Sequence, residues 1–288
     1  MAADELFAAP LAAFEASLGL PAPPASRKGP RPPRQQQDAQ EFLSFLLAAA
    51  HAELLLLLPP APPPPAPEPP SEEEEWATVG RGNVVTTTRT HSELAQPASR
   101  ASLVTALFGG VQESTVKCRG ERPSVTVEPF TLLSLDVSGD AVRSVEEALA
   151  AFAAPETIPD YANSRGVVEG AVRTLALRPP PLLLIHLKLF AYTARGLEKL
   201  RKRVTFREAL ALDKPVSLEA ARYRLAALVE HVGVSPRRGH YIAYARETAS
   251  GAWVRYDDAN VATVRLEEVL DRPAYILVYE READSAAK

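Results

Sequence analysis

The distribution of proline is the feature that most limits what this chain can fold into. Of its 27 prolines, sixteen precede residue 71, and nearly all of those lie in two clusters, at 21–33 and 59–70. Proline has no backbone N–H to donate and favours extended conformations, so both clusters are expected to be linkers or surface loops. In the first part of the chain, regular structure is therefore expected mainly between them.

The segment between the clusters predicts a helix. Residues Gln35 to Leu58 are rich in Ala, Leu, Gln and Glu, which have high helix propensity, and two prolines end the run. The apolar part is short for a bilayer span and contains His51 and Glu53, which favours a core helix over a membrane helix. The residues that recur at helical spacing, and whose face is expected to be buried, are Phe42, Phe45, Leu46 and Ala49. A remnant helix that would pack nearby is indicated by the spacing of Phe7, Leu11, Phe14 and Leu18.

Residues 59–82 are expected to be a disordered insertion. They contain a polyproline run at Pro62–Pro65 and an acidic run at Glu72–Glu75. The segment has few apolar groups to bury, and its like charges repel one another. The free energy gained by burial therefore cannot offset the entropy lost on ordering the chain. The polyproline run leaves open a role as a ligand for SH3- or WW-type domains, beside the simpler interpretation as a solvated loop.

From about residue 100 the sequence indicates mostly strands. One further helix is predicted from Ser144 to Phe152, with Glu146 and Glu147 in its first turn. Short apolar or alternating runs predict strands at Val125–Phe130, Leu132–Val137, Leu182–Phe190, Tyr223–His231, His240–Arg246, Trp253–Asp257 and Tyr275–Glu280. A helix-rich part followed by an antiparallel sheet predicts an α+β fold.

Composition narrows the class of protein. The 288 residues are 46% hydrophobic and carry a formal charge of −4, which is typical of a soluble globular chain and argues against nucleic-acid or membrane-surface binding. A single cysteine, Cys118, excludes an internal disulfide framework and a multi-cysteine zinc cluster. The amino terminus lacks the pattern of a signal peptide, so a reducing compartment, cytoplasm or nucleus, is expected.

Two β-rich runs near the carboxyl end predict a hairpin that carries a histidine and an aspartate. If Arg246 pairs with Gly251 across the turn, His240 lies directly opposite Asp257 on the same face, with Cβ atoms about 5 Å apart. A carboxylate beside an imidazole fixes its tautomer and stabilises the imidazolium, which is the base half of a nucleophilic triad. The alternative is a plain cross-strand hydrogen bond.

Several motifs, in the same order along the chain, resemble the ubiquitin-specific proteases, papain-like cysteine hydrolases that remove ubiquitin from proteins. Residues Gly239–Tyr241, Tyr256–Asp258 and Ala274–Glu280 resemble the family's histidine box. The segment Gln36–Leu43 resembles the helix that follows the nucleophile region, and Pro181–Lys188 resembles the strand that usually ends in Lys-Arg-Phe.

Further segments resemble the subgroup of ubiquitin carboxyl-terminal hydrolase ten. They are Glu74–Trp76, Leu107–Gly110 and Val127–Phe130. The resemblance implies a papain-like ubiquitin-specific protease fold, with an antiparallel sheet forming palm and fingers and a partial helical thumb. It implies a domain over residues 35–282, after a poorly defined segment 1–34 and before a tail at 283–288.

The resemblance also implies roles for five residues and a partner. His240 matches the general base, Asp257 its orienting carboxylate, and Asp258 a neighbouring acid that supports the site in some members. Asp38 and Glu41 match helix positions that contact the tail of ubiquitin. That tail reads Leu-Arg-Leu-Arg-Gly-Gly, so acidic side chains suit its arginines. The implied partners are ubiquitin and ubiquitinated proteins.

Two departures from the family concern cysteine. In the family, the nucleophile belongs to a cysteine box before the Gln-Asp-Ala helix, but residues 1–35 of this chain contain no cysteine. Cys118 lies in the finger-like segment and is expected to be a structural residue. The two Cys-x-x-Cys pairs that hold zinc in many members are also missing, so neither zinc nor another cofactor is expected. Three interpretations stay open: a truncated gene model of an active deubiquitinase, an inactive ubiquitin-binding pseudo-enzyme, or a scaffold that acts through residues 59–75.

The remaining polar residues are interpreted structurally. A basic cluster at 199–203 is expected to form a solvated turn, and Trp253 is expected to pack beside Tyr244 in the hairpin. The histidines expected to be hydrogen-bonded structural or surface residues are His51, His91, His186 and His231.

Overall fold

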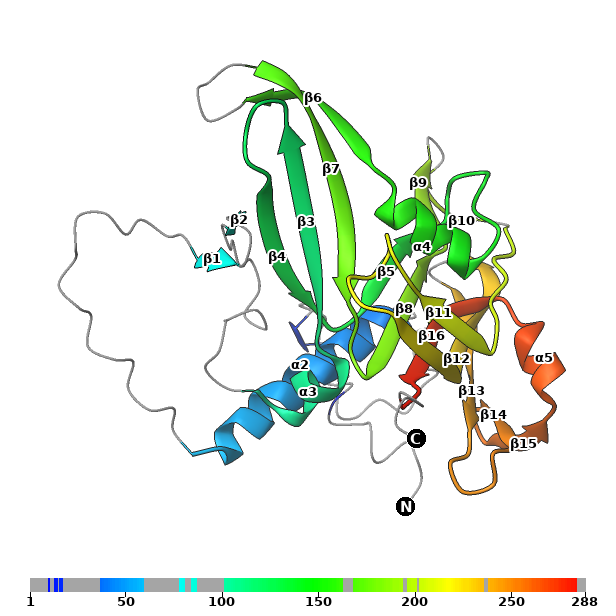
Figure 1. Ribbon diagram of the computed structural model, residues 1–288. Helices are drawn as coiled ribbons and strands as arrows, with labels where there is room; N and C mark the ends of the chain where they lie inside the picture. The colour runs from blue at the N-terminus through cyan, green and yellow to red at the C-terminus, as the bar shows by residue number, and fades with distance from the viewer. Residues whose placement is uncertain are drawn as a thin grey trace, which may run out of the picture.

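The computed structural model shows a mixed α+β fold built mostly from antiparallel strands, as the sequence predicts (Figure 1). It describes residues 10, 13–14, 16–17, 37–59, 78–80, 84–86, 101–162, 168–193, 196–200, 202–235 and 238–283. In the described part of the chain the helices are α2 (Ala39–Leu57), α3 (Leu103–Phe108), α4 (Val145–Ala153) and α5 (Leu266–Leu270). The expected helix near residues 10–17 is seen only in part, and His91 lies outside the described residues.

An eight-stranded sheet forms the larger body of the molecule. Its strand order is β15-β14-β13-β12-β16-β8-β5, with β11 paired to β12, and every pair except β5 with β8 is antiparallel. The strands are β5 (Leu133–Asp136), β8 (Leu182–Lys188), β11 (Ala209–Leu212), β12 (Ala221–Ser235), β13 (Arg238–Arg246), β14 (Trp253–Asp257), β15 (Asn260–Val264) and β16 (Ala274–Arg281). All seven predicted strands are present, and six of them belong to this sheet.

A six-stranded sheet forms a long arm that extends away from the larger sheet (Figure 1). Its strands are β1 (Thr78–Gly80), β2 (Val84–Thr86), β3 (Gly110–Cys118), β4 (Ser124–Phe130), β6 (Glu156–Ala162) and β7 (Val168–Arg178). A small hairpin is formed by β9 (Phe190–Thr193) and β10 (Gly196–Lys199). Strand β1 lies within residues 59–82, so the expected disorder is wrong for its three residues, and most of that segment is outside the described residues.

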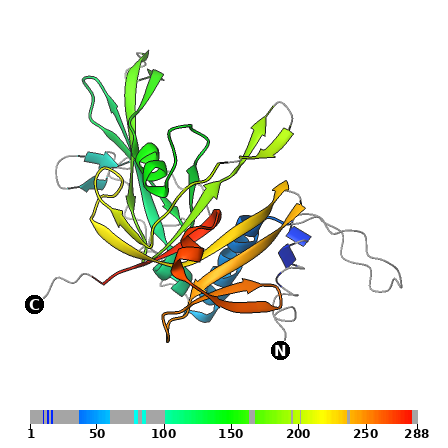
Figure 2. The same cartoon turned by 90° about the vertical axis from the view of Figure 1, so that its right-hand side faces the viewer.

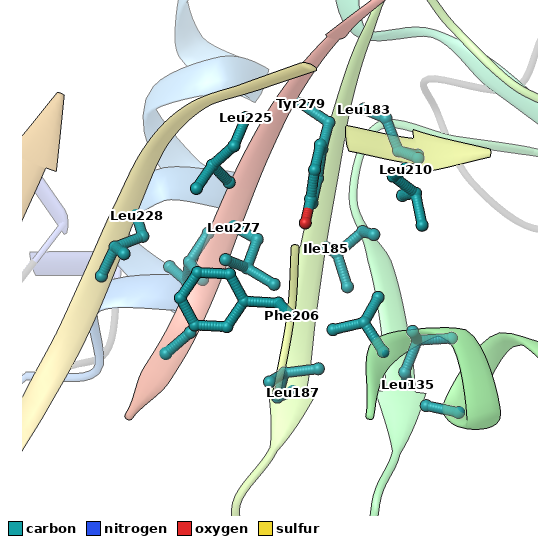
Figure 3. Packing of buried hydrophobic residues seen from close by; sticks show 14 of the residues in the cluster. Leu135, Leu183, Ile185, Leu187, Phe206, Leu210, Leu225, Leu228, Leu277 and Tyr279 are labelled. Atoms are coloured by element: carbon teal, nitrogen blue, oxygen red, sulfur yellow. The ribbon is translucent and has the colours of Figure 1, made fainter. Parts of the chain in front are cut away.

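The core packs on one face of the eight-stranded sheet. Side chains from β5, β8, β12 and β16 converge with those of β11 and Phe206 (Figure 3). Strand β8 runs through the middle with five consecutive buried residues, because both of its faces are covered. The opposite face, where His186 and Tyr275 lie, meets the helical part of the molecule: α3 contacts β8, and α2 contacts α3.

Helix α2 is shorter and less buried than the sequence analysis expects. It begins after Asp38 instead of Gln35, and none of its residues is fully buried, so the predicted buried face is wrong. The reason is that its apolar side has few packing partners in the described chain. One partner is Phe14, which is 3% exposed and whose ring lies 5.4 Å from that of Phe42 and 5.3 Å from that of Phe45.

Helix α2 is also long and apolar enough to cross a membrane, judged by length and composition alone. Hydrogen bonds nevertheless attach it to the folded domain. Asp38 accepts from Tyr275 of β16 at 2.5 Å, and Nδ1 of His51 lies 2.6 Å from Oγ of Ser102.

The basic cluster at 199–203 is not a solvated turn. Lys199 donates to the carbonyls of His231 and Gly233, and Lys202 donates to two carbonyls of the segment after β5. Arg203 pairs with Asp271. The two lysines therefore link this segment to β12 and to the residues after β5.

Replacing Phe14 tests whether the amino-terminal residues stabilise α2. In Phe14→Ala, the loss of a buried ring from between Phe42 and Phe45 should lower the free energy of unfolding by about 3 kcal/mol. Urea denaturation followed by circular dichroism measures the change. The matched control is Leu103→Ala, since Leu103 is 63% exposed on α3 and its truncation should cost less than about 0.5 kcal/mol. Equal, small losses in both variants would contradict the packing described.

Candidate active site

His240 and Asp257 are placed by the antiparallel pair β13 and β14. The register pairs Arg246 with Trp253 and Ala243 with Tyr256, so the predicted pairing of Arg246 with Gly251 is wrong by two residues. The turn is longer than assumed, and it is closed by hydrogen bonds between Glu247 and Ala252 and between Gly251 and Glu247. Asp257 is therefore displaced by two residues from the position directly opposite His240, where it was predicted. A shift of two residues keeps each side chain on its face of the sheet, so the predicted common face is correct.

The imidazole of His240 is bound by the carboxylate of Asp257. Its Nε2 lies 2.6 Å from Oδ1 of Asp257, a hydrogen bond that places the proton of the neutral ring on Nε2. Nδ1 is then left as the acceptor, and among the described residues it has no hydrogen-bond partner. In this arrangement a carboxylate orients an imidazole that can accept a proton at Nδ1.

The second oxygen of Asp257 is also occupied. Arg255, two residues earlier on β14, donates from Nη2 to Oδ2 of Asp257. The hydrogen bonds from His240 and from Arg255 hold the pKa of the Asp257 carboxyl below its ordinary value. This aspartate is therefore a carboxylate throughout the neutral range, with one oxygen for each partner.

Asp258 lies at the edge of the site. It begins the two-residue turn between β14 and β15, where its φ is 51°, a left-handed conformation that aspartate tolerates better than most residues. Its Oδ2 lies 3.9 Å from Nε2 of His240, and its side chain is 82% exposed. Ligand atoms of His240, Asp257 and Asp258 lie within 4.8 Å of one another, but both oxygens of Asp257 already accept hydrogen bonds. We assign no metal to them.

The two acidic residues of α2 differ in their surroundings. Asp38 is the N-cap: its Oδ1 accepts from the amides of Gln40 at 2.7 Å and Glu41 at 3.2 Å, and its Oδ2 accepts from Tyr275. The carboxylate of Asp38 therefore caps α2 and bonds it to β16. Glu41 is exposed in the first turn of the same helix.

A cluster of aromatic rings lies beneath the site, and no sequence motif pointed to it. Tyr275 of β16 has His186 edge-on at 4.9 Å and Phe190 at 5.7 Å, and the ring of Tyr241 lies 4.9 Å from that of His231. These residues come from five separate strands, so spacing along the chain could not bring them together. His186 and His231 are structural residues, as expected.

The buried polar groups of this cluster have strongly shifted pKa values. Burial lowers the pKa of the His186 imidazole to about 4. Its Nδ1 is hydrogen-bonded to Oγ of Ser134 at 3.0 Å. Burial lowers the pKa of His231, and the positive charge of Lys199 lowers it further. Burial raises the pKa of Tyr241 to about 12 and raises that of Tyr275 well above its ordinary value. All four groups are therefore uncharged near neutral pH.

Gly239 connects this cluster to the site. A Cβ at Gly239 would lie 2.3 Å from Nε2 of His231, so only glycine allows β13 to pass over that ring. The next residue is His240. The buried imidazole of His231 thus supports the backbone that carries His240. The glycine before the histidine in the motif was the signal that could have indicated such a close approach.

Trp253 and Tyr244 are both buried in the hairpin, but they are not direct cross-strand partners as predicted, because Trp253 pairs with Arg246 and Tyr244 pairs with Arg255. The prediction that Cys118 is a structural residue is confirmed by its burial. Cys118 is buried at the end of β3, in the six-stranded sheet, whereas His240 belongs to the eight-stranded sheet. Figures 1 and 2 show the end of β3 in the arm, well away from the hairpin β13–β14, so Cys118 is not positioned as its nucleophile.

The family model of ubiquitin carboxyl-terminal hydrolase matches residues 27–279. That match covers far more than half of the chain and includes both sheets and the His240–Asp257 pair. The chain belongs to this family.

Curated relatives agree with the family. Over 261 residues the chain is 36% identical to ubiquitin carboxyl-terminal hydrolase 24 of Arabidopsis thaliana, covering 86% of the chain and 46% of the relative. It is 33% identical to ubiquitin hydrolase B of Dictyostelium discoideum, covering 85% and 55%, and 31% identical to ubiquitin carboxyl-terminal hydrolase 10 of Rattus norvegicus, covering 72% and 27%. The chain thus spans about half, or less, of the length of the curated relatives it matches.

Solved structures agree with the fold. A SAGA DUB module containing Ubp8 and bound to monoubiquitin matches with a TM-score of 0.66 at 25% identity, covering 86% of this chain and 49% of that one. A yeast SAGA DUB module matches with a TM-score of 0.66 at 27% identity, covering 86% and 51%. The domain therefore has the ubiquitin-specific protease fold.

The buried histidines predict a steep loss of stability in acid. The unfolded chain protonates these imidazoles near their ordinary pKa of 6.5, whereas folded His186 resists protonation down to about 4. Unfolding is therefore favoured as pH falls through this window, and His186 alone contributes on the order of 3 kcal/mol of lost stability. Urea denaturation at a series of pH values between about 7 and about 4.5 measures it.

The variant His186→Asn separates this effect from general destabilisation. Asparagine can still bond Ser134 but does not titrate, so the loss of stability between the two ends of the pH series should be smaller than in the parent. A parallel pH profile, merely displaced to lower stability, would show that His186 does not cause the acid sensitivity.

Proposed function

We propose that this chain supplies the ubiquitin-binding surface and the base half of the active site of a thiol-dependent deubiquitinase, which hydrolyses the bond after the terminal glycine of ubiquitin. The observation that carries the proposal is the hydrogen bond between Nε2 of His240 and Asp257, which leaves Nδ1 as the acceptor. Membership of the family supplies the chemistry in which such a pair is used. Cytoplasm or nucleus is the proposed location.

The mechanism follows from the arrangement of this pair. Nδ1 of His240 would take the proton of a cysteine thiol, and the thiolate would attack the carbonyl of the terminal glycine. The resulting imidazolium is stabilised by Asp257 and returns the proton to the leaving amine. Water, activated by the same imidazole, then releases the acyl-enzyme. The thiol itself is not in this chain, because its single cysteine is Cys118 of the arm.

A second candidate function follows from that missing thiol. A pseudo-enzyme would keep the surfaces that hold ubiquitin and have no hydrolytic activity. The pair His240–Asp257 is assembled without a nucleophile, and the carboxylate of Asp38 is held by the domain itself. Binding and chemistry are therefore separable here, and they need separate measurements.

A ubiquitin with an electrophile in place of its terminal carboxyl measures the chemistry. The chain should form no covalent adduct with it, since the family's nucleophile is absent and Cys118 is buried in the arm. Binding of unmodified ubiquitin, followed by NMR titration of its backbone amides, should still occur. An adduct on Cys118 would contradict the assignment of the nucleophile, and absence of binding would contradict the proposed function.

A charge reversal on α2 tests where the ubiquitin tail lies. Glu41→Lys should weaken binding by about fivefold, because it replaces an exposed acid facing basic residues by a like charge. The matched control is Glu53→Lys, an exposed acid three turns further along the same helix, which should leave the affinity unchanged. Isothermal titration calorimetry measures both. Equal effects in the two variants would indicate a general charge effect and contradict the proposed tail contact.

A further inference from the structure

Arg255 contacts the catalytic pair, although no motif singled it out. It precedes Asp257 by two residues on β14, so both side chains leave the same face of the strand. Its Nη2 donates to Oδ2 of Asp257, while Oδ1 of the same carboxylate accepts from His240. The carboxylate is thus held at both oxygens by two different partners.

A carboxylate needs such a second partner to keep its orientation. The terminal torsion of aspartate has a broad energy minimum, so a carboxylate bonded through one oxygen can rotate. The side chain of Asp257 is 19% exposed, which allows water to compete for its oxygens. A guanidinium bound to Oδ2 fixes the plane of the carboxylate and directs Oδ1 toward His240, and hydrogen bonds between charged groups are about twice as strong as neutral ones.

Arg255 also interacts electrostatically with residues other than Asp257. Its direct cross-strand neighbour is Tyr244, whose hydroxyl donates to the buried carboxylate of Glu230 at 3.0 Å. The hydrogen bond to Asp257 and the nearby Glu230 both raise the pKa of the guanidinium. Arg255 is therefore a permanent cation that lies beside Tyr244 and binds the carboxylate of Asp257.

We propose that Arg255 is a positioning residue that orients the Asp257 carboxylate, so that Oδ1 accepts the Nε2–H of His240 and Nδ1 is left to act as the base. The charged groups that face the ring are Asp257 and Asp258 from β14 and its turn, with Arg255 behind them. The proposal rests on the proposed role of His240, but the orientation of the ring can be measured without ubiquitin or a nucleophile.

The test follows the ring N–H of His240 by NMR in the full chain labelled with ¹⁵N. In the parent protein the Nε2–H proton should exchange slowly with water, because it is bonded to a fixed carboxylate. In Arg255→Met the exchange should become about tenfold faster, and the ring should move toward the mixture of tautomers of an unconstrained histidine. Arg255→Lys keeps the cation but not the planar fork, so it should restore part of the protection.

The matched control is Arg246→Met. Arg246 lies on the adjacent strand β13 and pairs with Glu280 at 3.6 Å instead of Asp257, so its loss should leave the His240 proton as in the parent. Backbone amide spectra establish that each variant is folded. Unchanged exchange in Arg255→Met, or equal acceleration in Arg246→Met, would overturn the proposal. Failure of ubiquitin binding would refute the proposed function alone, since this readout involves no ubiquitin.

Discussion

The pairing of β13 with β14 is the constraint on which the site depends. Side chains alternate between the two faces of a strand, so a change of register by one residue would move Asp257 to the opposite face from His240. The turn at 247–252, which connects the two strands, closes this register at the start of β14. The hydrogen bond of 2.6 Å between the two side chains is a consequence of that pairing.

Much of the larger sheet could be predicted from the sequence, because its strands are apolar and end at turns. The register of the hairpin could not, since it depends on the length of a turn whose residues allow several conformations. Strands β3 and β7 of the arm were missed for a different reason. Their side chains are mostly half-buried and mix polar with apolar residues, so they lack the alternation that indicates a strand with one covered face.

The residues around His240 and Asp257 show where spacing along the chain stops being informative. His240 and Asp257 were found through a local hairpin and a motif. Two further residues could be identified only from three-dimensional contacts. His231, 9 residues before His240 in the sequence, lies directly beneath Gly239. Arg255 binds the second oxygen of Asp257. Asp38 shows the converse: a residue assigned to ubiquitin by resemblance also caps α2 and bonds Tyr275, a structural use that resemblance did not indicate.

The proposed role of His240 and Asp257 predicts that the end of the ubiquitin tail lies beside them. Ubiquitin with a nitroxide spin label at its carboxyl terminus would locate that end by paramagnetic broadening of the chain's NMR signals. We expect the strongest broadening at the amides of Gly239, His240 and Asp258. Broadening centred on the arm strands β3 and β7, with the signals of β13 unaffected, would contradict the account.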